Sequence, residues 1–298
     1  MKGTLRMRAK ISEKNIFPDF DLFEEYQKIE YLLSEANAIG TYNQFGKRIN
    51  PRFTMEQYIN DLYFTNWNLR GTFISIEEMR MGLGIEKKRF SKENISTDLV
   101  LDFIQYAANC NLRVAETIEY CSTAYLADKN HINVLIDNMK ALLNHLGAYF
   151  SLDKETSEVF VVYDDDLSII VADEHPEIEI SLVEYKKIDN HGDLKRKGEV
   201  LCTLYKRLEA DEKKFKGTTY EKLCSDTTFL FNKTGIRHWV EKDKIASKTF
   251  LEMQPEELEL WYDRTYTMFL SCMIISQYLD IKKEIDGIKA VLVSEKNS

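Results

Sequence analysis

Apolar residues return every three or four positions through most of the chain, the spacing that places them on one face of an α-helix. The clearest stripe is Leu201, Leu204, Tyr205 and Leu208. The pattern predicts helices in both halves of the chain. They cover residues 19–39, 54–65, a short run from Ser75 to Gly82, 98–110, 114–127, 131–146, 177–188, 193–216, 218–234 and 255–283.

Several of these helices have recognisable first and last residues. Thr218 followed by Glu221 has the spacing of a capping box, and Pro255 is a residue favoured in the first turn of a helix. Gly217 and Gly235 stand just past the ends of two stripes, where glycine accepts the left-handed conformation that ends a helix. These signals predict separate helices joined by short turns.

The period changes in the middle of the chain. Residues 158–163 and 167–171 are rich in β-branched side chains, and Asp164, Asp165 and Asp166 lie between them. This pattern predicts a β-hairpin, to which residues 148–150 would add a third strand. The three aspartates lack the glycine and the terminal glutamate of a calcium loop, which favours a charged turn.

We therefore expect a mainly α protein with two helical modules and a small β-hairpin between them. Residues 1–150 would form an N-terminal helical domain, and residues 151–298 the hairpin followed by a helical bundle. The composition agrees with this fold class, because 12 Gly and 4 Pro among 298 residues are few for an all-β chain.

Charge is distributed unevenly between the halves. Residues 1–150 hold 18 Lys and Arg against 19 Asp and Glu, whereas residues 151–298 hold 22 against 30. The acidic second half argues against a broad phosphate-binding face, so a nucleic-acid contact would have to be local.

Cofactor, metal and membrane sites have no support in the sequence. There is no GxxxxGK[ST] or GxGxxG phosphate loop, and the five cysteines include no CxxC pair of the kind that holds structural zinc. The most apolar run, residues 268–278, is too short to span a bilayer. We expect a cytoplasmic protein without a cofactor, a metal or a membrane segment.

The candidate site is the run from Asn232 to His238, between two helical segments. Metal-independent cleavage of RNA needs a base for the 2′-hydroxyl proton and a cation for the phosphorane, and His238 and Arg237 suit these roles. Asn232 and Lys233 would orient phosphate oxygens. The structural alternative is a helix C-cap, because cations are favourable at the negative end of a helix.

A resemblance to a known family rests on five short segments, residues 193–197, 208–209, 231–232, 236–238 and 257–262. Through them, residues 185–275 look like the C-terminal module of bacterial abortive-infection-type proteins, which resembles the HEPN (higher eukaryote and prokaryote nucleotide-binding) superfamily of helical bundles. The resemblance implies an RNA- or nucleotide-directed protein of a bacterial defence system, either abortive infection or toxin–antitoxin, that dimerises across the motif face.

The superfamily's catalytic signature is an Arg, a polar residue and a His four to six residues further on. Arg237 and His238 match its first two positions, but residues 241–244 read Glu-Lys-Asp-Lys and no later histidine follows. Because the distal histidine is missing, we expect binding rather than metal-independent ribonuclease activity. Two alternatives remain open, a noncatalytic module that binds a partner protein and a DNA-binding regulator built on residues 54–90.

Overall fold

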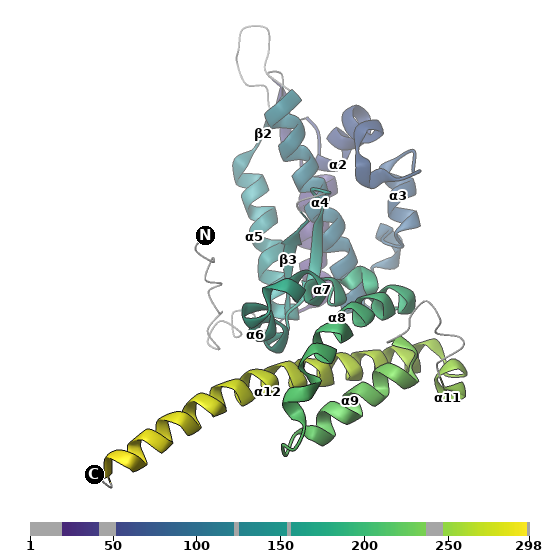
Figure 1. Cartoon of the computed structure of the whole chain (residues 1–298). Helices are drawn as coiled ribbons and strands as arrows, with labels where there is room; N and C mark the ends of the chain where they lie inside the picture. Colours follow the sequence, from purple (N-terminus) through teal and green to yellow (C-terminus); the bar gives the residue numbers. More distant parts are fainter. Residues whose placement is uncertain (1–19, 42–51, 122–124, 154–155, 237–246, 297–298) are drawn as a thin grey trace. The chain divides into compact units, whose positions relative to one another are not determined.

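The computed structural model describes residues 20–41, 52–121, 125–153, 156–236 and 247–296 (Figure 1). The chain divides into two compact units, Met1–Tyr163 and Asp164–Ser298. Helices dominate both units, which confirms the predicted mainly α fold class. Each unit is described by itself.

The first unit is built on two long helices that pack together with shorter helices and turns. Its helical segments, with π or 3-10 turns written as η, are α1 (Leu22–Glu30), η2 (Tyr31–Glu35), α2 (Met55–Tyr58), η3 (Ile59–Tyr63), η4 (Phe64–Asn66), η5 (Asn68–Arg70), α3 (Ile76–Gly82), η6 (Lys87–Arg89), α4 (Thr97–Cys121) and α5 (Lys129–Leu146). A single helix, α4, replaces the predicted helices 98–110 and 114–127, so the predicted break between them was wrong, and residues 125–127 form a strand instead of helix.

An aromatic cluster and a buried ion group form the centre of this unit. Tyr26 of α1 stacks on Phe90 with ring centroids 3.9 Å apart and meets Phe103 of α4 edge-on at 4.9 Å. Beside them, Arg80 of α3 is only 8% exposed. Its guanidinium lies 2.7 Å from Glu30 and 3.2 Å from Glu56, so one buried cation joins carboxylates of α1 and α2.

Each of the two small sheets among the described residues has two antiparallel strands. β1 (Ile39–Thr41) pairs with β2 (Tyr125–Ala127), and β3 (Ala148–Leu152) pairs with β4 (Val159–Tyr163). The hairpin therefore joins 148–152 to 159–163, and the predicted pairing of 158–163 with 167–171 was wrong. Residues 167–171 lie instead in α6 (Asp166–Glu174), whose first turn is capped by Asp165 accepting a hydrogen bond from Leu167 N at 3.1 Å.

The hairpin belongs to the first unit because α4 holds its outer strand. Asn109 of α4 exchanges two hydrogen bonds with the backbone of Val159, at 2.7 and 2.9 Å, and Gln105, one helical turn earlier, accepts one from Val161 N at 2.8 Å. These side chains satisfy backbone groups that an edge strand would otherwise leave open. The boundary between the units accordingly lies after Tyr163, later in the chain than the predicted position at residue 150.

The second unit is a bundle in which α12 lies along α8 and α9 (Figure 1). Its apolar core is formed by residues of these three helices together with α6 and α7. In addition to α6, its helical segments are η7 (Pro176–Ile178), α7 (Glu179–Tyr185), η8 (Ile188–Asn190), α8 (Leu194–Phe215), α9 (Glu221–Lys233), α11 (Lys248–Leu251) and α12 (Pro255–Lys296). As predicted, α12 begins at Pro255, but it continues well past the expected end at residue 283.

Candidate nucleic-acid interface

The candidate site lies at the C-terminal end of α9. Here Thr234 and Ile236 are fully buried, and Gly235 has φ +80°, a left-handed conformation that glycine adopts without strain. Ser247 N donates a hydrogen bond of 2.9 Å to the carbonyl oxygen of Lys233. This bond fixes the start and the end of the 234–246 connection to the same helix terminus.

The last carbonyl groups of α9 find partners among the described residues. Leu230 O accepts hydrogen bonds from the backbone N and the hydroxyl of Thr234, at 2.9 and 2.7 Å, and Asn232 O accepts one from Gly235 N at 3.3 Å. With Ser247 on Lys233 O, three of these carbonyls are satisfied without Arg237 or His238. Capping of α9 therefore does not require the Arg-His pair.

Of the four predicted site residues, the structure describes two. Asn232 is half-buried, whereas Lys233 is exposed. The ammonium of Lys233 lies 5.9 Å from the ring centroid of Phe229, one turn earlier on the same face, and that ring is 54% exposed. Arg237 and His238 lie outside the described residues. The sequence reasoning missed Phe229, although a phenylalanine four residues before Lys233, outside the apolar stripe of α9, marks an exposed aromatic.

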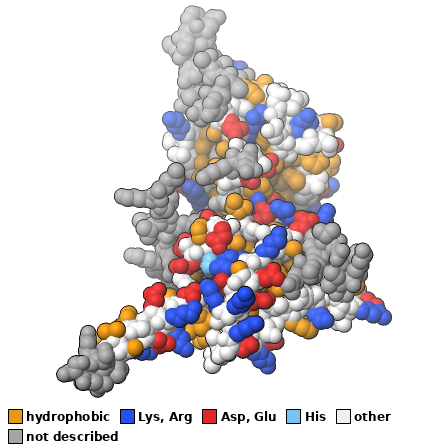
Figure 2. Space-filling model, viewed as in Figure 1, with side chains coloured by type: hydrophobic (Ala, Val, Ile, Leu, Met, Phe, Trp, Pro, Cys, Tyr) orange, Lys and Arg blue, Asp and Glu red, His pale blue; other side chains and the backbone are white. Residues whose placement is uncertain are grey.

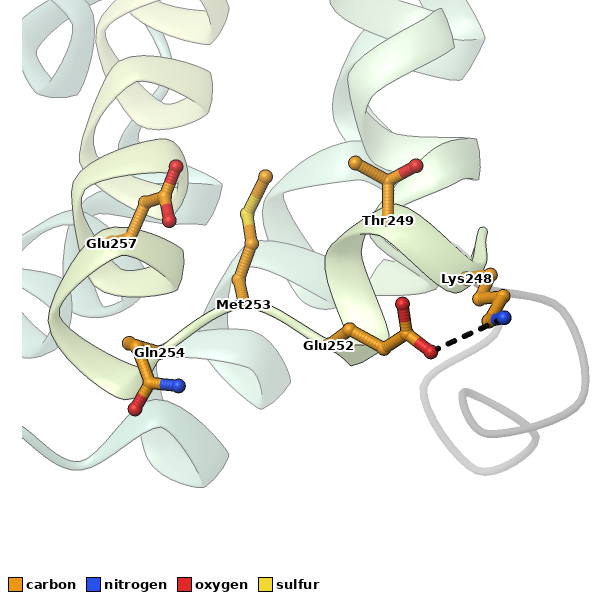
Figure 3. A pocket seen from close by; sticks show the side chains of 6 residues that line it. All are labelled: Lys248, Thr249, Glu252, Met253, Gln254 and Glu257. Atoms are coloured by element: carbon orange, nitrogen blue, oxygen red, sulfur yellow. Dashed lines mark ion pairs between the residues drawn. The ribbon is translucent and has the colours of Figure 1, made fainter.

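A shallow pocket of about 440 Å³ lies just past Ser247 (Figure 3). Lys248 and Glu252 form an ion pair of 3.5 Å at its edge, and Glu257 adds a second carboxylate. Two carboxylates against one ammonium make this pocket unsuitable for phosphate. It is lined by Lys248, Thr249, Glu252, Met253, Gln254 and Glu257.

A buried lysine joins two of the five segments singled out in the sequence, residues 193–197 and 257–262. Lys197 of α8 is 6% exposed, and its ammonium lies 2.7 Å from Glu259 and 2.9 Å from Asp263, both on α12. Tyr185 of α7 donates a further hydrogen bond to Asp263 at 2.8 Å. These contacts hold three helices together, so Lys197 and Glu259 have a structural role in joining helices.

A second polar group lies between α8 and α12. The buried carboxylate of Asp211 accepts a hydrogen bond of 2.6 Å from Ser276 and lies 3.0 Å from Arg207 and 3.3 Å from Lys214. Burial raises the pKa of Asp211, but the hydrogen bond from Ser276 and the contact with Arg207 outweigh it, so this pKa lies below its ordinary value.

This lowered pKa predicts an acid-sensitive contribution to the stability of the second unit. A carboxyl group whose pKa is lower in the folded state stabilises above its unfolded pKa, and that contribution disappears as pH falls through the folded pKa. We expect Asp211→Asn to cost about 1.5–3 kcal/mol at pH 7, the usual value of hydrogen bonds to a charged group. The cost should shrink below about pH 4.

Urea unfolding of the full chain between pH 7 and pH 3, followed by circular dichroism, measures this difference. Asp226→Asn, which removes one carboxylate from the exposed face of α9, serves as the matched control and should show little cost at either pH. An equal cost of Asp211→Asn at pH 7 and at pH 3 would contradict the assignment.

Residues 54–90, the segment predicted to bind DNA in one alternative, pack into the interior of the first unit through α3. Helix α3 ends at Gly82, and Ile76, Met79 and Arg80 on it are buried, so its arginine faces the core. On the visible face of the molecule, positive and negative side chains are interspersed (Figure 2). These features do not favour the DNA-binding alternative.

The described residues show neither a metal site nor a membrane-spanning helix. Within them, no group of three or more His, Cys, Asp or Glu side chains is placed to hold a metal ion. None of the helices in those ranges combines the length and the apolar character that crossing a bilayer requires.

No protein-family model, curated protein or solved structure matches this chain.

Proposed function

We propose that this chain is a HEPN-like protein that binds RNA or a nucleotide at the C-terminal end of α9, as part of a bacterial defence system. The observation that carries the proposal is the exposed pair of Phe229 and Lys233, and Arg237 and His238 follow in the sequence after three further residues. The missing distal histidine favours binding over cleavage.

The chemistry of this pair suits an unpaired base and its phosphate. Single-stranded RNA is bound where bases stack on aromatic side chains while cations contact the backbone. Phe229 offers a ring that is more than half exposed, and Lys233 places a cation over it. A ring with this exposure gives the fold little packing energy, so its face is accessible to a base.

The setting of the site supports the same assignment. Phe231, two residues from Phe229, is fully buried and fixes α9 in the bundle, so the exposed face keeps its position. The negative end of the α9 dipole attracts cations, which favours Lys233 in the last turn of this helix. Phosphate would then be bound by this side chain and not by the helix backbone.

The proposal predicts a specific loss of RNA affinity. In a fluorescence-anisotropy titration of the full chain with a labelled single-stranded RNA, Phe229→Ala should weaken binding about tenfold, because stacking on one base contributes about 1–3 kcal/mol. Lys233→Ala should reduce the slope of log K against log salt by about 0.7, the value for one phosphate contact on a single strand.

Matched controls come from the same unit. Leu260→Ala truncates another exposed apolar side chain, and Lys222→Ala removes a cation from the opposite end of α9, so both should leave affinity unchanged. Arg237→Ala should also abolish binding without lowering the melting temperature. Equal losses for Phe229→Ala and Leu260→Ala, or unchanged affinity for all three site variants, would overturn the proposal.

A further inference from the structure

The second half of α12 leaves the bundle. Its last side-chain contacts with the neighbouring helices, among those described, are the edge-on pair of Tyr278 with Tyr220 and the ion pair of Asp280 with Lys214 at 2.8 Å. From Ile281 to Leu292 every residue is exposed. Figure 1 shows this end of α12, in yellow, extending past α8 and α9.

The exposed stretch carries a regular apolar stripe. Its members alternate in steps of three and four residues, the a and d positions of a coiled-coil heptad. Each is between 40% and 60% exposed, and hydrophobic side chains are visible along this end of the helix in Figure 2. The stripe consists of Tyr278, Ile281, Ile285, Ile288 and Leu292.

Charged residues flank the stripe in a pattern that selects one partner and one orientation. With Ile285 at an a position, Glu284 is at g and Lys282 and Lys289 are at e. In a parallel coiled coil g faces e of the next chain, which places Glu284 against Lys289 of another copy. In an antiparallel pair e faces e, which would place lysines against lysines.

We propose that α12 assembles copies of this chain through a parallel coiled coil formed by residues 278–292. The inference is independent of RNA binding at α9. Isoleucine at both a and d positions allows three strands as well as two. The proposal therefore specifies parallel pairing between copies of this helix, and the measured mass of the assembly gives the number of chains.

Two physical features make a short seam of this kind sufficient. The first half of α12 is packed in the bundle, so the helix is already nucleated and association does not have to order it. The stripe is also bordered by charged side chains, Lys282, Glu284 and Lys289, at three of its flanking e and g positions, and only Val291 widens it. A helix that lies on a membrane needs a broader apolar face, so another copy of the same helix is the better match.

Sedimentation velocity of the full chain over a concentration series tests the proposal. We expect an assembly of two or more chains. Ile288→Lys should raise its dissociation constant by at least about a hundredfold, because it removes from every strand an isoleucine that the assembly buries. Ile288 is 60% exposed in the single chain, so this change should leave the fold intact. Ala290→Lys, which adds the same charge at an outward f position, is the matched control.

Charge reversal tests the orientation. Glu284→Lys places a lysine against Lys289 of another copy at each contact and should raise the dissociation constant of the assembly by about tenfold. Adding Lys289→Glu to the same chain should restore it in a parallel coiled coil, whereas in an antiparallel one positions 284 and 289 do not face each other, so Glu284→Lys alone should have little effect. A monomer at all concentrations, an oligomer that Ile288→Lys leaves unchanged, or no restoration by the double reversal would overturn the proposal.

Discussion

Replacing Arg80 with methionine is expected to destabilise the first unit by about 3–5 kcal/mol, the usual cost of removing one partner from a buried ion pair. Arg80 bridges Glu30 and Glu56 at 2.7 and 3.2 Å, and both carboxylates would lose the cation that compensates them. Tyr26 and Tyr106 donate hydrogen bonds to the same two carboxylates, at 3.0 and 2.7 Å, but hydroxyl groups do not neutralise charge.

The two carboxylates respond differently to their surroundings. Burial raises the pKa of Glu30, but two contacts with Arg80 outweigh it and this pKa lies below its ordinary value. Burial dominates at Glu56, whose pKa is raised. Arg80 therefore compensates Glu30 more completely, and we expect Glu30→Gln to rescue much of the loss caused by Arg80→Met.

A double-mutant cycle with these two changes measures the coupling. Hydrogen exchange on peptides of α4, read by mass spectrometry in the full chain, reports on the first unit separately. Lys88→Met, a change of the same chemistry on the surface, should cost less than about 0.5 kcal/mol. Additive costs in the cycle would show that Arg80 and Glu30 do not stabilise the fold as a pair.

Two phenylalanines on α9 should respond oppositely to truncation. Phe231 is 0% exposed and packs against Tyr205 with ring centroids 4.8 Å apart, so Phe231→Ala should destabilise the second unit by about 3–5 kcal/mol. Phe229, two residues earlier on the opposite face, is 54% exposed, and Phe229→Ala should cost less than about 1 kcal/mol.

The comparison separates stability from binding on a single helix. Hydrogen exchange on α8 and α12 peptides measures the free energy of opening in the second unit, and the RNA titration measures affinity. Only Phe231→Ala should speed exchange, whereas Phe229→Ala should affect only affinity. Fast exchange in Phe229→Ala would mean that this ring belongs to the core, and the proposed site would lose its basis.

Local signals predicted the helices of the bundle well. The ends of α8 and α9 and the start of α12 follow from Gly217, Gly235 and Pro255, because these residues act on the backbone directly. The error at residues 167–171 has a physical cause. The β-branched residues favour a strand, but the cap by Asp165 and burial of Val171 outweigh that preference.

The polar interior was less accessible to sequence reasoning. Lys197 lies at helical spacing from Leu194 and Leu201, so its place on the inner face could have been predicted, but its partners Glu259 and Asp263 depend on how α8 and α12 meet. The same holds for Arg80 and Glu30, which are 50 residues apart in the chain. At the site, the sequence indicated Lys233 by its neighbours, and the exposure of Phe229 could have been predicted from its place outside the apolar stripe of α9.

The hydrogen bond from Ser247 to Lys233 has a consequence for how this protein can evolve. The bundle therefore holds both ends of the connection, and Thr234 and Ile236 at its start are buried. Doubling the length of such a connection costs only about 0.6 kcal/mol of closure entropy. We therefore expect insertions after Ile236 to be tolerated by the bundle, and under the proposed function such insertions would change ligand preference while the core sequence stays the same.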